Sequence, residues 1–228
     1  SSLAEIATGS YAYGISEDGR YVLFGSDATN LPGGDGSFQL YLRDMSQTGN
    51  EAITHISLAP DGSALPDVDA WQKSLSAAGD RAVFTSEIDG EYAMLVWEAD
   101  PASLVSGPVT GSTKILERLV DDGSSYLRPA FLSANGRWFT SRQGENPEGQ
   151  RVARINTISG SDYVLPETSP WEPGADFWPW GISANGSRII FTSDDLSLPP
   201  GEVGAFWLLD YVPLPDVTIF KDSFEADP

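Results

Sequence analysis

The sequence predicts an all-β protein, a four-bladed β-propeller whose blades are antiparallel sheets of four strands. The first observation is a phrase that occurs four times, an apolar residue followed by Ser-x-x-Gly and a run of strand-forming residues. The second is the even spacing of its serines, Ser16, Ser76, Ser133 and Ser183, at intervals of 60, 57 and 50 residues. From the last serine through the C-terminus and on to the first is 61 residues. A ring of four similar units would give such intervals.

Each copy of the phrase predicts a β-hairpin. Glycine takes a positive φ without penalty and a preceding Asp or Asn tolerates a left-handed backbone, so Ser-x-Asp/Asn-Gly forms a tight turn between apolar runs. The first blade is expected to have the strands Tyr11–Ser16, Arg20–Ser26, Phe38–Asp44 and Ala52–Ile56. In later blades the matching third strands are Tyr92–Glu98, Arg151–Thr157 and Ala205–Asp210, and the fourth strands are Lys114–Val120 and Asp162–Leu165.

The repeats predict one domain over residues 1–216, with blades at about 9–56, 66–120, 126–165 and 176–211, and a C-terminal tail at 217–228. The last blade lacks a clear fourth strand, because Pro213 and Pro215 follow Asp210 and proline cannot donate to a strand ladder. We expect residues 3–8 to supply this outer strand and close the ring. Two alternatives stay open: Val217–Phe220 as the outer strand, and a fold that is half of a larger or dimeric propeller.

Composition excludes several classes of function. The chain has 33 acidic and 13 basic residues and a net charge of −20, which would repel the phosphates of nucleic acid. Without cysteine it cannot form a disulfide, a catalytic thiolate or a cysteine zinc site. We find no apolar run long enough for a membrane span and no recognisable signal peptide.

The repeat resembles a known family. Ser-x-Asp-Gly-Arg-Tyr-Val-Leu-Phe-x-Ser at residues 16–26, followed by Leu-Tyr-Leu-Arg-Asp at 40–44, resembles the PD40 (WD40-like) repeats of TolB-type β-propellers. Phe24–Leu31 is similar to a subgroup of these repeats in exported bacterial proteins, and Ile219–Glu225 is similar to a tail on some exported bacterial proteins. The resemblance implies a bacterial protein that is periplasmic or secreted. It does not indicate the ligand, because propellers include binding modules and enzymes.

The predicted innermost strands carry the candidate binding residues. Five positions before the repeat serines stand Tyr11, Trp71, Arg128 and Trp178, and seven positions before two of the serines stand Asp69 and Asp176. Three positions before the serines stand Tyr13, Lys73, Ala130 and Trp180, and alternation along a strand puts these sets on one face. Blade symmetry would gather the side chains at one mouth of a central channel. The competing interpretation is that the aromatic rings wedge between blades as ordinary core.

No metal, cofactor or catalytic residue is predicted. The single histidine, His55, lies in an outer strand, away from the channel where a catalytic triad would be expected. Calcium needs several clustered oxygen ligands, and the loops Asp27–Asp35 and Asp194–Asp195 lack an alternating Asp-x-Asp spacing. We expect these acids to cap turns.

We expect a non-enzymatic recognition domain outside the cytoplasm that binds a protein, peptide or glycan, as a monomer or dimer. An aromatic and charged channel mouth would suit a sugar or the end of a peptide. One alternative is a carbohydrate-active hydrolase that uses carboxylates in the channel. The other is a structural half-propeller that pairs with another copy.

Overall fold

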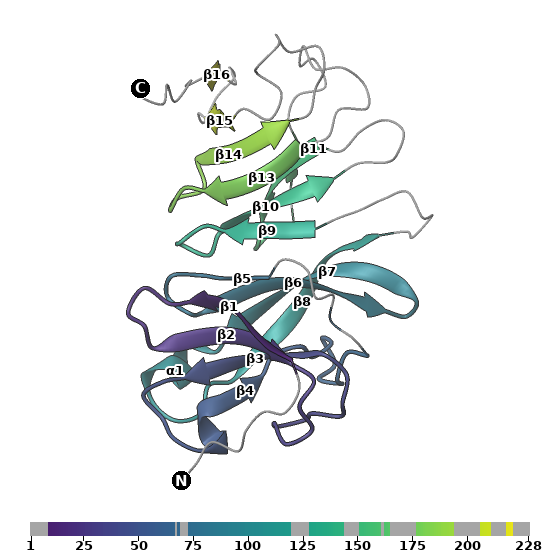
Figure 1. The fold of residues 1–228 in the computed structure, drawn as a ribbon, viewed down its shortest axis with the longest axis vertical. Coiled ribbons are helices and arrows are strands. Elements are labelled where there is room, and N and C mark those ends of the chain that lie inside the picture. The colour runs from purple at the N-terminus through teal and green to yellow at the C-terminus, as the bar shows by residue number, and fades with distance from the viewer. Residues whose placement is uncertain are drawn as a thin grey trace. The chain divides into compact units, whose positions relative to one another are not determined.

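The structure confirms an all-β fold of antiparallel sheets (Figure 1). It is a computed structural model that describes residues 9–66, 68, 73–119, 128–143, 151–160, 162–164, 177–193, 206–210 and 218–220. In this part of the chain sixteen strands form four sheets of four strands. The chain divides into two compact units, Ser1–Val120 and Asp121–Pro228, with two sheets in each. None of the described helices is long and apolar enough to cross a membrane.

Sheets 1 and 2 form the first unit, coloured purple to teal in Figure 1. Sheet 1 comprises β1 (Ser10–Ile15), β2 (Tyr21–Ser26), β3 (Gln39–Asp44) and β4 (Ile53–His55). Sheet 2 comprises β5 (Ser74–Leu75), β6 (Arg81–Ile88), β7 (Glu91–Ala99) and β8 (Gly111–Leu119). Two short helices accompany them, η1 (Asn50–Ala52) and α1 (Pro101–Val105).

Sheets 3 and 4 form the second unit. Sheet 3 comprises β9 (Arg128–Leu132), β10 (Trp138–Gln143), β11 (Arg151–Asn156) and β12 (Asp162–Val164). Sheet 4 comprises β13 (Phe177–Ile182), β14 (Arg188–Ser193), β15 (Phe206–Asp210) and β16 (Thr218–Phe220). In every sheet the strands pair in chain order, and the strands predicted from sequence match them to within three residues at either end.

The outer strand of sheet 4 differs from the main prediction. It is β16, which pairs with β15 and places Ile219 opposite Leu209. The assignment of this place to residues 3–8 is therefore wrong, and residues 218–220 belong to a sheet and not to a tail. Pairing with a strand close in sequence costs less loop-closure entropy than joining the two ends of the chain. Residues 3–8 lie outside the described residues, and closure of the sheets into one ring is not seen in the described part of the chain.

The repeat serine holds each turn closed. Ser16 Oγ accepts a hydrogen bond from the N–H of Tyr21 at 2.8 Å, and Ser133 Oγ accepts one from the N–H of Trp138 at 3.0 Å. The Ser16 hydroxyl also donates to Asp18 Oδ1 at 2.6 Å. The glycine three positions after each serine has a positive φ in all four turns, at Gly19, Gly79, Gly136 and Gly186. The recurring phrase is thus a structural turn.

In two of the turns the repeat glycine also receives an aromatic ring from the preceding sheet. Tyr21 of sheet 1 packs on Gly79 of sheet 2, and Trp138 of sheet 3 packs on Gly186 of sheet 4. At both glycines a Cβ atom would overlap the ring. Since a side chain larger than hydrogen would also be strained at this φ, both the backbone and the packing select glycine.

The core of the first unit lies between sheets 1 and 2. Sheet 1 contributes apolar side chains from one face, and these are Tyr21, Leu23, Leu40 and Leu42. Sheet 2 contributes the facing set, which includes Ala82, Phe84, Ala93, Leu95 and Trp97. All of these side chains are buried, and each large one stabilises the fold by about 1.5–3 kcal/mol. This pairing of faces is the arrangement expected of adjacent blades.

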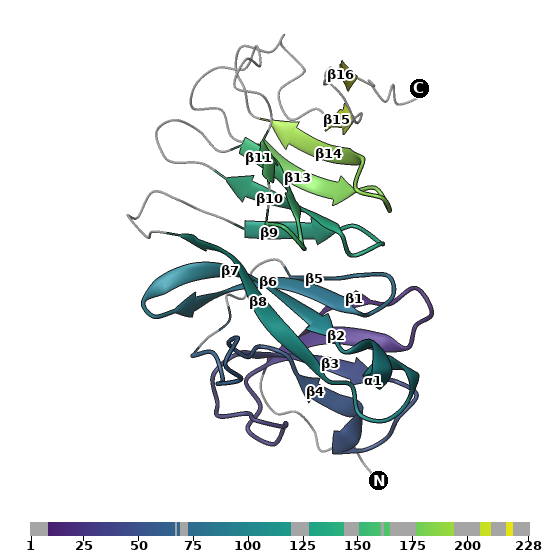
Figure 2. The same cartoon turned by 180° about the vertical axis from the view of Figure 1, so that it is seen from behind.

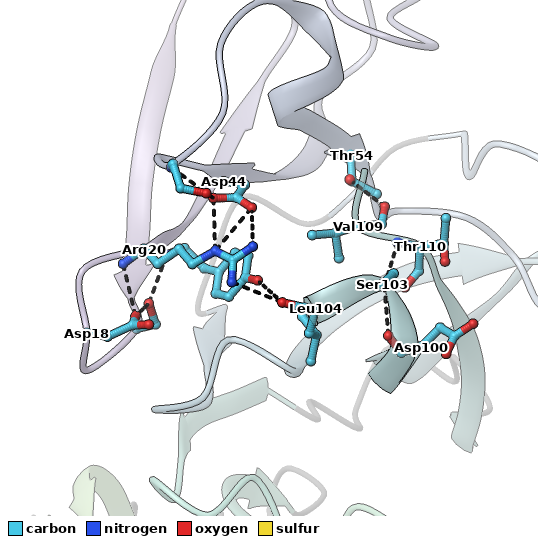
Figure 3. Close-up of polar contacts among 12 residues, drawn as sticks. Asp18, Arg20, Asp44, Thr54, Asp100, Ser103, Leu104, Val109 and Thr110 are labelled. Carbon is cyan, nitrogen blue, oxygen red and sulfur yellow. Dashed lines mark hydrogen bonds and ion pairs between the residues drawn. The ribbon is translucent and has the colours of Figure 1, made fainter. Parts of the chain in front are cut away.

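The segment between β7 and β8 fastens sheet 2 to sheet 1 (Figure 3). Arg20 donates to both carboxylate oxygens of Asp44 at 2.8–3.2 Å, and its Nη1 donates to the carbonyl of Leu104 at 2.9 Å. Thr54 Oγ1 donates to the carbonyl of Val109 at 2.7 Å. The helix α1 contains Leu104 and ends shortly before Val109. Figures 1 and 2 both show α1 beside the strands of sheet 1. A guanidinium matched at two points to a carboxylate is a strong, oriented ion pair.

Replacing Gly79 with alanine is expected to destabilise the protein more than replacing Gly19. Their φ values are 73° and 72°, so each alanine bears a left-handed strain of about 1–2 kcal/mol. At Gly79 the new methyl also meets the Tyr21 ring, which adds an overpacking cost of about 1–3 kcal/mol, whereas nothing lies within 4 Å at Gly19. Urea unfolding of the two variants measures the difference. Equal losses would contradict the packing assigned to Gly79.

Asp44 is expected to make stability depend on pH in the acidic range. Burial raises the pKa of Asp44, but hydrogen bonds from Arg20 and Ser46 outweigh it, so the folded pKa lies below the ordinary value. Its contribution is therefore present above the unfolded pKa of about 3.9 and is lost as pH falls through the folded pKa. Below about pH 4 the free energy of unfolding should fall more steeply in the wild type than in Asp44→Asn. Parallel curves from urea unfolding at several pH values would argue against this role.

Candidate functional site

Three aromatic rings and a lysine meet beside the inner strand of sheet 1. Tyr11 and Tyr13 lie on β1, Phe38 directly precedes β3, and Lys73 directly precedes β5 of sheet 2. The ring centroids of Tyr11 and Phe38 are 6.2 Å apart. Lys73 Nζ lies 4.7 Å from the centroid of the Tyr13 ring and 5.3 Å from that of Phe38. We call these four residues the inner-strand cluster.

A glycine inside β2 makes room for the cluster. Gly25 lies opposite Tyr11 in the strand pairing. A Cβ atom at Gly25 would overlap the Phe38 ring and lie 3.0 Å from Cε2 of Tyr13. Two rings therefore rest directly on the backbone of β2, which is a common reason for glycine inside a strand.

A β-bulge places Tyr13. The pairing of β1 with β2 has an irregularity between Ala12 and Gly14, so that Tyr13 is an extra residue. Trp180 is the extra residue at the same point of β13. The bulge adds one residue to β1, yet Tyr13 still lies on the same face as Tyr11, because its ring approaches the Cβ position of Gly25, the strand partner of Tyr11. From this face the Tyr13 ring meets Lys73 of the next sheet.

The cluster has a buried cation and an exposed ring. Lys73 is 4% exposed, and its ammonium is attracted by the electron-rich faces of Tyr13 and Phe38. Tyr11 is 60% exposed, and its ring lies over the backbone of Gly9, 3.1 Å from the point where a Cβ would stand. The part that a ligand can reach is therefore the Tyr11 ring beside the half-buried Phe38. Such a surface can stack on a sugar, an aromatic group or a cation.

The remaining predicted site residues are divided among different places. Trp178 is half-buried on β13, opposite Thr192. Arg128 begins β9, and its side chain lies outside the described part of the structure. Asp69, Trp71 and Asp176 also lie outside it. The structure therefore describes only Tyr11 and Trp178 of the six predicted side chains, and they belong to different units.

Phe38 is the member of the cluster that sequence reasoning missed. It stands outside the inner strands, at a position that the alignment of repeat serines does not mark. The signal that could have found it is Gly25, because glycine within an otherwise apolar strand often marks the close approach of another group.

The histidine takes part in a buried polar network. His55 Nε2 lies 3.0 Å from Gln39 Oε1 and 2.9 Å from Ser57 Oγ. Ser57 Oγ donates to Gln39 Oε1 at 2.6 Å and accepts from the N–H of Leu40 at 2.9 Å. Burial lowers the pKa of His55, although the Asp35 carboxylate opposes the shift. Since Ser57 and Gln39 are fully buried, this Ser–His contact is a structural network and not an exposed nucleophile with its base.

The acids of the β2–β3 loop are only partly explained by turn capping. Asp35 Oδ1 accepts hydrogen bonds from the N–H and hydroxyl of Ser37, and these lower the pKa of Asp35. Asp27 Oδ1 is buried without a hydrogen-bond partner. Among the described residues no three His, Asp or Glu side chains gather as a metal site would require. Asp194 and Asp195 lie outside the described residues.

No protein-family model and no curated protein matches the sequence. Solved structures match at low identity. TolB from Acinetobacter baumannii gives a TM-score of 0.52 at 15% identity, over 93% of this chain and 43% of that one. The putative TolB from Agrobacterium tumefaciens gives a TM-score of 0.54 at 16% identity, over 95% of this chain and 63% of that one. The β-propeller domain of the Trilobed protease from Pyrococcus furiosus gives a TM-score of 0.50 at 11% identity, over 92% of this chain and 56% of that one.

These likenesses concern the fold alone. The four antiparallel sheets match those of β-propeller domains, and the predicted resemblance to TolB-type propellers is confirmed at the level of structure. The chain spans 43–63% of the length of these three solved chains.

Stability is expected not to depend on a bound metal. The chain has no cysteine and one histidine, and Asp35 is engaged in its own turn. Thermal melting curves recorded with EDTA and with added calcium, at constant ionic strength, should therefore coincide. A rise of several degrees in the melting temperature on adding calcium would overturn this expectation.

Proposed function

We propose that this protein is a recognition domain that binds a glycan or a peptide end at the inner-strand cluster, without catalysing a reaction. The observation that carries the proposal is the Tyr11 ring, which lies on the inner strand β1, is 60% exposed and stands beside Phe38. Large exposed aromatic side chains on a rigid element are common in binding sites, because they contribute contact area at a small entropic cost.

The supports of Tyr11 make it suitable for binding. Its strand is paired with β2 on one side, and Gly25 allows Phe38 to pack closely against that strand. Lys73 lies beneath the rings from the next sheet, so two sheets hold the platform. A preorganised aromatic surface loses little conformational freedom when a ligand stacks on it.

Charge narrows the ligand class. At a net charge of −20 the protein attracts cations and repels anions at long range. Lys73 is too buried to serve as the contact for an anion. A neutral sugar or the positively charged amino end of a peptide therefore suits the Tyr11 ring better than a phosphate or an acidic segment.

The proposed setting is outside the bacterial cytoplasm, either periplasmic or secreted. It rests on the resemblance of the first blade and of residues 219–225 to segments of exported bacterial proteins. The hydrolase alternative would require a pair of carboxylates at the bound sugar. Asp69 and Asp176, the acids at the corresponding inner positions, lie outside the described residues.

Binding to immobilised glycans and to a peptide library tests the proposal, with Tyr11→Ala beside the wild type. Tyr92→Ala is the matched control, because Tyr92 is a second exposed tyrosine on a strand of the same unit. For a ligand found in the screen, Tyr11→Ala should lower the affinity about tenfold, since a ring contact is worth roughly 0.5–1.5 kcal/mol beyond its area. Tyr92→Ala should bind like the wild type, and both variants should keep the melting temperature.

Three outcomes would contradict the proposal. Equal affinity of Tyr11→Ala and wild type would remove Tyr11 from the site. A failure of every glycan and peptide to bind would argue against recognition of these ligands. Release of product from a bound glycan, measured over several turnovers, would replace recognition with hydrolysis.

A further inference from the structure

One face of sheet 4 exposes large apolar side chains. Trp180, Ile190 and Phe206 are 56%, 44% and 53% exposed, whereas Phe191 on the opposite face of β14 is fully buried. The rings of Trp180 and Phe206 pack edge to face with centroids 6.3 Å apart. Because the rings are already ordered against each other, this surface is a built face and not a set of scattered side chains. We call it the tail face, and it consists of Trp180, Arg188, Ile190 and Phe206.

The repeat indicates what kind of surface belongs on the tail face. Ile190 stands seven residues after its repeat serine, as Leu23 does in sheet 1, and strand pairing makes Phe206 the counterpart of Leu40. Leu23 and Leu40 are fully buried in the core that sheet 1 shares with sheet 2. The face of sheet 2 that packs against Leu23 and Leu40 bears Phe84. A partner for the tail face is therefore the Phe84-type face of another blade.

Sheet 1 itself presents such a face. Phe24 occupies the same position after the serine as Phe84 and is half-buried. Nothing lies within 4 Å of a Cβ built at Gly19, although an aromatic ring covers Gly79 and Gly186 at that position. Ile15 is 63% exposed, while its counterpart Leu75 is 9% exposed. We call this surface the head face, and it consists of Ile15, Glu17, Gly19, Val22 and Phe24.

The charges of the two faces are complementary. Tyr21 and Trp138 each stand five residues after a repeat serine, and their rings cover a turn of the next sheet. In sheet 4 the same position is occupied by Arg188, which is exposed. The turn of sheet 1 contains Glu17 and Asp18, both exposed, whereas the other three repeat turns have no charged residue between the serine and the glycine. Docking the faces as the repeat prescribes would therefore set Arg188 against the one acidic turn.

We propose that the tail face of one copy binds the head face of a second copy, and that two such contacts join two chains into one ring. Two copies would supply eight blades, within the range of roughly four to eight that propellers use. A head-to-tail contact that closes forms a ring without leaving an unsatisfied face.

Molecular mass in solution is the first measurement, by analytical ultracentrifugation over a range of concentrations. The wild-type chain of 24.5 kDa should sediment as a dimer. Ile190→Asp places a charge at the centre of the tail face and should raise the dimer dissociation constant at least about tenfold. Val105→Asp is the control, because Val105 is 82% exposed on α1 and belongs to neither face.

A charge exchange separates contact between copies from contact within one chain. Arg188→Glu and Glu17→Arg should each weaken the dimer about tenfold, because each puts like charges together at both contacts. Neither change removes a repeat turn: Glu17 contributes only its backbone N–H to the bond with Ala77, and circular dichroism checks the fold of both variants. An equimolar mixture of the two variants should regain dimers containing one chain of each kind. In such a dimer one contact pairs the two substituted side chains, which again carry opposite charges, and the other contact is wild type.

Three results would overturn the proposal. A wild-type chain that stays monomeric at all concentrations excludes the ring of two copies. If the contact is restored only when Arg188→Glu and Glu17→Arg are combined in one chain, and that chain stays monomeric, the tail face binds the head face of the same chain. A dimer that Ile190→Asp and the charge variants leave intact would place the interface elsewhere.

Discussion

The fold depends on a constraint at the junction of neighbouring sheets, where an aromatic ring lies on a glycine that must also take a positive φ. Tyr21 on Gly79 and Trp138 on Gly186 are two copies of this contact, one in each unit. The same turn therefore reverses the chain within its sheet and receives the preceding sheet. Since the glycine satisfies both demands, the repeat can tolerate wide variation elsewhere and still set the position of one blade on the next.

The inner-strand cluster is built on the same junction. Lys73 lies at the start of sheet 2, and its ammonium contacts the rings of Tyr13 and Phe38, which belong to sheet 1. Its ammonium gives up water for aromatic faces, and the rings gain a fixed position from the cation. Packing between sheets and presentation of a surface are thus one arrangement: the buried side chains hold the junction, and Tyr11 is the part left exposed.

The strands could be predicted from sequence because turns and alternating apolar residues are local signals, whereas the errors came from features without such signals. The bulge at Tyr13 and Trp180 was not predicted, because it depends on the pairing of two strands and leaves no mark in the sequence of either one. Phe38 joined the cluster through a long-range approach to Gly25. The outer strand of sheet 4 was assigned by a global argument about closure, while a short local pairing formed β16.

The bonds from Arg20 and Thr54 to the segment between β7 and β8 bear on how the protein folds as it is synthesised. Arg20 reaches the carbonyl of Leu104, 84 residues further along the chain, and Thr54 reaches that of Val109. Sheet 1 leaves the ribosome before sheet 2, yet Arg20 and Thr54 find these partners only after β7 and the segment that follows it have emerged. We therefore expect sheet 1 to reach its full stability during synthesis only together with sheet 2, although the sequence repeats one blade at a time.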